Sequence, residues 1–145
     1  MVNVQRIKFA AVVPPGVIKD NASWTATTVD TKGWRHCLIV GQLGATDIAM
    51  AACKLTESDD DSTYTDVTGG DFSVSSTLPS ATADNTFFAW DVKLTGTRKR
   101  YLKPTLTAGD GTAGTYLSVF AILSRGENAP YTDSGRGLAA DCLVI

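Results

Sequence analysis

The residues of this chain that could carry out chemistry are few and far apart. His36 is the only histidine, and it lies in an apolar run between Arg35 and Cys37. A serine-hydrolase triad needs a histidine beside a nucleophile and an orienting acid, and no G-x-S-x-G nucleophile turn occurs in the sequence. We therefore expect His36 to be a hydrogen-bonded core or interface residue, and we expect the protein not to be an enzyme.

Residues 109–114 have the sequence Gly-Asp-Gly-Thr-Ala-Gly, which matches the G-x-G-x-x-G pattern of dinucleotide sites. Such a site needs this run between a strand and a helix, because the helix N-terminus binds the pyrophosphate. The residues that follow, 115–124, alternate in the manner of a strand. We therefore expect the glycines to serve a hairpin turn that needs positive φ angles, and we expect no cofactor.

Glu57 and residues 59–61 form an acidic cluster that could attract a cation. The cluster lacks the spacing of a calcium-binding loop, so a solvated hairpin tip that discourages edge pairing is the expectation. Zinc would need more ligands than one histidine and the separated Cys37, Cys53 and Cys142, which we expect to be buried free thiols in a reducing compartment. No metal site is therefore expected.

The basic residues Arg98, Lys99, Arg100 and Lys103 gather around Tyr101. An oligonucleotide-binding barrel could use such a strand, with the aromatic ring for stacking. However, the formal net charge of −2 gives no reason to expect attraction to nucleic acid. We expect instead a surface strand that contacts an acidic protein partner.

The elements that must position these residues are predicted by apolar side chains that recur with a period of two. In residues 86–94, Phe88, Trp90, Val92 and Leu94 share one face, which is typical of a half-buried strand. Residues 34–40 are apolar on both faces, which predicts a central strand between two layers. Residues 46–56 are open to two interpretations. Thr46 could cap a helix over the alanines that follow it. We choose instead a strand that leads through an acidic turn into residues 63–67. Further strands are predicted over residues 4–13, 23–29, 72–74, 98–107 and 115–124.

About eight to ten strands at this spacing predict an all-β fold, an antiparallel β-sandwich or a jelly-roll-like barrel. We expect one domain over residues 1–125, in which residues 1–15 form an N-terminal arm or strand, and an extended C-terminal arm over residues 126–145. The chain has no apolar run long enough to span a membrane, and its first residues lack the order of a signal peptide. We therefore expect assembly in a cytoplasm and no membrane partner.

Several stretches resemble a family of small virion proteins of tailed phages and prophages. They are residues 43–51, 55–60, 64–67, 100–103, 108–114 and 121–125, and the resemblance covers roughly residues 30 to 130. It names no catalytic motif, and Cys37 and the tail after Pro130 lie outside the part that is similar. The resemblance implies a β-rich capsid accessory or decoration protein.

The leading hypothesis is a capsid decoration, or cement, protein that binds the major capsid protein on the outer surface of the assembled head. We expect a homotrimer, because capsids present threefold sites. The alternatives are another virion part, such as a tail or head–tail junction component, and a carbohydrate- or ligand-binding sandwich with Trp24, Trp34 and Tyr64 as stacking surfaces. The residues expected at the interface are Pro14, Pro15, Arg98, Arg100, Pro130, Tyr131, Leu143 and Ile145.

Overall fold

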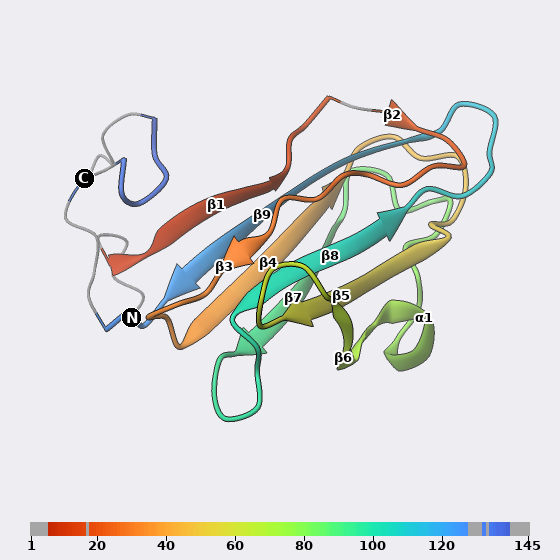
Figure 1. The fold of residues 1–145 in the computed structure, drawn as a ribbon. Coiled ribbons are helices and arrows are strands. Elements are labelled where there is room, and N and C mark those ends of the chain that lie inside the picture. The colour runs from red at the N-terminus through yellow and green to blue at the C-terminus, as the bar shows by residue number, and fades with distance from the viewer. Residues whose placement is uncertain (1–5, 17, 128–131, 133, 140–145) are drawn as a thin grey trace.

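A computed structural model of the chain describes residues 6–16, 18–127, 132 and 134–139 (Figure 1). Within these residues there are nine strands and one short helix. Their bounds are β1 (Lys8–Val13), β2 (Ile18–Lys19), β3 (Val29–Asp30), β4 (His36–Leu43), β5 (Ala52–Ser58), β6 (Thr65–Asp71), α1 (Phe72–Ser75), β7 (Phe87–Lys93), β8 (Tyr101–Thr107) and β9 (Thr115–Ser124). The helix has four residues, and none of the described helical structure is long and apolar enough to cross a membrane.

The strands form two antiparallel sheets that lie one over the other (Figure 1). One sheet has the order β1-β9-β4-β7, with β2 also pairing with β9, and the other has the order β3-β8-β5-β6. Among the described strands, the two edges of each sheet do not pair with the other sheet, so the fold is a sandwich and not a closed barrel. The predicted all-β antiparallel fold is confirmed.

The pairing of the strands is that of a jelly roll. β5 pairs with β6, and outward from this hairpin β4 pairs with β7, β3 with β8 and β1 with β9. The chain is therefore one long antiparallel ribbon folded across itself, which places successive strand pairs in opposite sheets. As a consequence, the glycine-rich run at residues 109–114 crosses from one sheet to the other between β8 and β9. The expected hairpin at this run is wrong, although Gly114 does have a positive φ of 84°.

The core fills the space between the two sheets, and alternating residues of each long strand supply it. On β7 the buried residues are Phe88, Trp90 and Val92, as the sequence predicts. β9 buries Leu117, Val119, Ala121 and Leu123, and β4 buries Cys37, Ile39 and Leu43. β4 is central in its sheet but is covered on one face only, so the prediction of a strand between two layers is wrong for its other face.

Three further predictions about strands need correction or refinement. Residues 72–74 belong to the helix α1, because the Asp71 side chain caps it by accepting a hydrogen bond from the Ser73 backbone N–H at 2.8 Å. Residues 23–29 form no continuous strand: Trp24 bonds to Leu106 of β8 and Thr27 bonds to Val12 of β1, so this segment contacts each sheet in turn. The strand predicted over residues 46–56 begins only at Ala52, and no helix precedes it.

Candidate functional site

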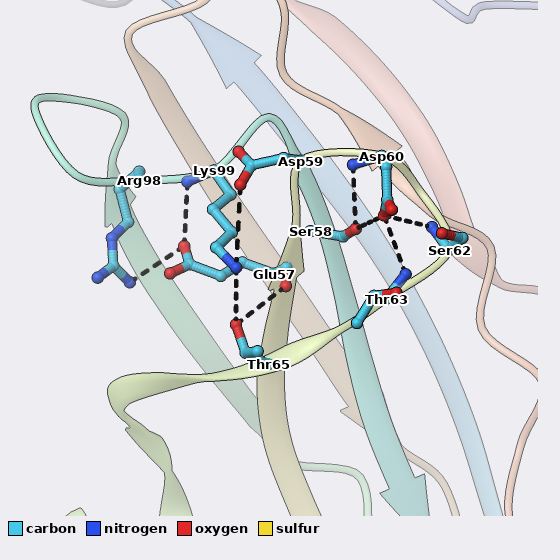
Figure 2. A network of polar contacts seen from close by, with 9 residues as sticks. All are labelled: Glu57, Ser58, Asp59, Asp60, Ser62, Thr63, Thr65, Arg98 and Lys99. Carbon is cyan, nitrogen blue, oxygen red and sulfur yellow. Dashed lines mark hydrogen bonds and ion pairs between the residues drawn. The ribbon is translucent and has the colours of Figure 1, made fainter.

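The predicted basic cluster is neutralised by carboxylates of the same molecule. Arg100 donates two hydrogen bonds to the Asp30 carboxylate at 2.8 and 2.7 Å, and this contact holds the pKa of Asp30 below its usual value. Arg98 lies 3.5 Å from Glu57, and Lys99 lies 3.9 Å from Asp59 (Figure 2). An acidic partner would therefore have to compete with internal acids for these side chains. The interface role of Arg98 and Arg100 stays a prediction.

The acidic turn stabilises its own hairpin (Figure 2). Asp60 accepts hydrogen bonds from the Ser58 hydroxyl at 2.8 Å and from the backbone N–H groups of Ser62 and Thr63 at 3.0 and 2.9 Å, which keeps the pKa of Asp60 far below its usual value. Glu57 is buried rather than solvated, and its carboxylate accepts a bond from the Lys99 backbone N–H. In the part of the chain that the structure describes, no three acidic, histidine or cysteine residues gather as metal ligands.

The glycine-rich run does bind an anionic group, but the group belongs to the protein itself. The Asp47 carboxylate accepts hydrogen bonds from the backbone N–H groups of Thr112 and Ala113, both at 2.6 Å, and of Gly114 at 3.2 Å. Asp20 accepts a further bond from the Gly111 N–H at 2.8 Å. The bonds from the loop lower the pKa of Asp47. These amides are therefore not available to a phosphate, and sequence reasoning missed both aspartates because they are distant from the run.

His36 connects two strands on the outer side of its sheet. Its Nδ1 atom lies 3.1 Å from the Ser124 hydroxyl, and its Nε2 atom lies 2.5 Å from the Asp91 carboxylate. These are the residue types of a hydrolase triad, but the two ring nitrogens are used in the opposite order: a triad serine bonds to Nε2 and its buried acid to Nδ1. The Asp91 side chain is 68% exposed, and Ser124 is paired with His36 within the ladder of β9 and β4. The expected hydrogen bonds of His36 are present, but its side chain is partly exposed and lies outside the core, and an interface role stays a prediction.

The two cysteines that the structure describes, Cys37 and Cys53, are free and buried, as predicted. Burial raises the pKa of each thiol to about 12, so neither is a reactive thiolate at neutral pH. Cys142 lies outside the described residues.

The most distinctive surface is the outer side of the β1-β9-β4-β7 sheet. Phe87, Tyr116 and Phe120 are 64%, 44% and 36% exposed there. Around them lie the half-buried Leu38, Val40 and Ile122, and the strand register places Val40 beside Phe120 and Leu38 beside Ile122. We call these six residues the outer apolar face. Taking about 200 Å² for a whole aromatic side chain, the three rings leave on the order of 300 Å² uncovered, which is comparable with the largest apolar patch of a typical monomer.

The sequence contains a signal for this face, but the prediction made from it is wrong. The apolar residues on both sides of residues 34–40 suggested a second covering layer, whereas the structure leaves one side open to solvent. The residues of 115–124 that lie opposite the core-facing ones, including Tyr116 and Phe120, belong to the same open side.

A groove of about 480 Å³ lies between the edge strands β6 and β7. Residues 67–72 form one wall and residues 89–93 the other. The Trp90 indole N–H donates a hydrogen bond to the Gly70 carbonyl at 2.8 Å, which ties the two sheets together beside the groove. Phe72 packs edge-to-face against Trp90, with ring centroids 5.3 Å apart.

The remaining predicted site residues are dispersed. Pro14 and Pro15 are exposed just after β1, and Pro130, Tyr131, Leu143 and Ile145 lie outside the described residues. Of the proposed stacking surfaces, Trp24 is buried in the core. The Tyr64 hydroxyl bonds to Thr28, and the Lys103 ammonium covers its ring at 5.3 Å. Trp34, the third of these aromatics, is half-buried and packs against the core, so the three do not form a shared exposed platform for a sugar.

Comparison with known proteins gave distant structural likeness only. No protein-family model and no curated protein matches the chain. Among solved structures, the crystal structure of the SPBc2 prophage-derived protein YomS is similar, with a TM-score of 0.48 and 11% sequence identity over 85% of this chain and 96% of that one. A likeness at this distance carries no argument about function.

Proposed function

We propose that the protein is a non-enzymatic virion component, a decoration protein that binds the outer surface of an assembled phage head and stabilises it. The observation that carries the proposal is the outer apolar face, where Phe87, Tyr116 and Phe120 are exposed on one side of the sheet. Contiguous exposed apolar patches mark interaction sites on soluble proteins. The resemblance of residues 30 to 130 to small virion proteins supports a phage particle as the place of that interaction.

The size of the face fits binding at many equivalent sites. Burial of roughly 300 Å² at about 25 cal/mol per Å² contributes on the order of 7 kcal/mol before any cost is counted. Association itself costs about 4–15 kcal/mol. A single contact of this kind is therefore modest, and a repeated lattice of sites, as a capsid surface provides, would make the total stabilisation large.

The fold does not by itself decide between the proposed roles, because jelly rolls serve both capsid and sugar-binding proteins. The structure gives the sugar-binding alternative no exposed aromatic platform at Trp24 and Tyr64.

The proposal is tested by co-sedimentation with heads assembled without this protein. Replacement of Phe87 and Phe120 together by Ser should weaken binding at least about tenfold, because both rings would leave the contact. Val74→Ser is the matched control, since Val74 is 81% exposed on α1 and lies outside the outer apolar face. Equal binding by wild type, the double variant and the control would exclude the outer apolar face, and no binding by wild type would reject the capsid role.

A further inference from the structure

In the described part of the sandwich, three of the four edge strands have features that hinder pairing with a strand of another chain. At the β1 edge, the Phe9 N–H is already bonded to the Arg136 carbonyl at 2.7 Å. β3 has two residues only. The pairing of β6 with β5 is irregular between Lys54 and Thr56. In addition, the Gly70 carbonyl of β6 already accepts a hydrogen bond from the Trp90 indole N–H. Such devices protect edge strands from pairing with other chains.

β7 is the exception. It is a regular strand of seven residues, and its described pairing is with β4 on one side only. Five consecutive residues, 89–93, line the groove beside it, including both core-facing and solvent-facing positions. A groove lined in this way follows the backbone edge of the strand and not one of its faces. Among the described residues no strand pairs with this outer edge of β7, so its N–H and C=O groups have no ladder partner there.

We propose that a second copy of the chain pairs with this edge, antiparallel, around a twofold axis at Val92. This register places Asp91 opposite Lys93 of the partner subunit, and the symmetry repeats the pair. Lys93 has no ion pair among the described residues, and Asp91 uses Oδ1 for His36, which leaves Oδ2 free. Registers centred on residue 91 or 93 would instead place like charges opposite each other, which is unfavourable.

The pairing joins two sheets into one of eight principal strands, in which the two outer apolar faces lie on the same side. The exposed aromatic area would double to roughly 600 Å². An edge that pairs with itself closes at two copies, so this inference predicts a dimer in place of the homotrimer expected from the sequence. It does not depend on the proposed capsid role.

Sedimentation equilibrium over a range of concentrations tests the dimer. The wild-type protein should reach twice the monomer mass of 15.3 kDa. Lys93→Asp should weaken the dimer roughly tenfold, because it turns two opposite-charge contacts into two like-charge contacts. The charge swap of Lys93→Asp with Asp91→Lys should restore most of the affinity. Lys32→Asp, which makes the same charge change in an exposed turn, is the control and should leave the mass unchanged.

Circular-dichroism melting checks that each variant is folded. If a variant is not folded, Lys93→Gln replaces it, and a smaller loss of dimer affinity is then expected. A monomer at the highest concentration would overturn the inference, as would a trimer. A dimer that Lys93→Asp leaves intact, or that the charge swap fails to restore, would place the contact somewhere other than this register of β7.

Discussion

At the scale of single residues, carboxylates largely determine what the loops of this protein can do. The run at residues 109–114 has the spacing of a phosphate-binding loop, yet its amides are bonded to Asp47 and Asp20. The basic residues 98–100 are likewise balanced by internal acids. Both motifs thus make contacts within the molecule, and a ligand or partner would have to compete with these internal acids.

Replacement of Asp47 by Ala should lower the melting temperature at neutral pH, because three backbone N–H groups lose their acceptor. Since the pKa of Asp47 is depressed by folding, its contribution is present above the ordinary carboxyl value of 3.8 and is lost as the pH falls through the lower folded value. The difference between wild type and Asp47→Ala should therefore shrink in acid. Thermal scans at several pH values measure it, with Asp110→Ala in the same loop as control. A difference that is constant with pH would show that the charge of Asp47 is unimportant.

At the scale of elements, the aromatic cluster of β7 and α1 holds the two sheets together beside the groove. Phe72, Phe88 and Trp90 pack edge-to-face, with centroids 5.3 to 5.8 Å apart. Gly41 on β4 makes this possible, because a Cβ atom there would collide with the Phe88 ring. The cluster fixes β7, and therefore also its free edge, relative to the core.

Trp90→Ala should reduce the free energy of unfolding by about 3–5 kcal/mol, as for other large aromatic truncations in cores. The neighbouring Ala89 faces solvent, so Ala89→Ser should change the free energy of unfolding by less than about 0.5 kcal/mol. Urea unfolding curves give both values. Comparable effects of the two substitutions would mean that the faces of β7 are assigned the wrong way round.

The elements that could be predicted are those whose pattern is local. The period of two identified β4, β7 and β9 and the core-facing residues of β7, because alternation depends only on neighbours along the chain. α1 was missed because its capping bond from Asp71 competes with a sequence that also suits a strand. The partners of Asp47 and Arg100 lie 65 to 70 residues away, and no local pattern reports such contacts.

At the scale of the whole molecule, the jelly-roll ribbon makes the N-terminal segment part of the body. Residues 1–15 were expected to form an arm or a strand, and within the described part of this segment the strand β1 pairs with β9 of the same chain. Val12 and Val13 are buried in the core. The sequence could not show this, because the two paired strands lie near opposite ends of the chain.

Deletion of residues 1–13 should therefore destroy the native fold, since it removes core side chains and leaves the edge of β9 open to aggregation. Size-exclusion chromatography and circular dichroism check this outcome. Deletion of residues 1–5 is the control and should leave the described strands in place. A folded, soluble product of the longer deletion would return residues 1–15 to the role of a dispensable arm.

The central claim, that the outer apolar face is the surface that binds a phage head, is tested most directly by electron cryomicroscopy of heads incubated with the purified protein. The account predicts added density on the outside of the shell, with the β1-β9-β4-β7 sheet turned toward the capsid and Phe87, Tyr116 and Phe120 in the contact. Heads without added density, or protein bound through the β3-β8-β5-β6 sheet, would contradict it.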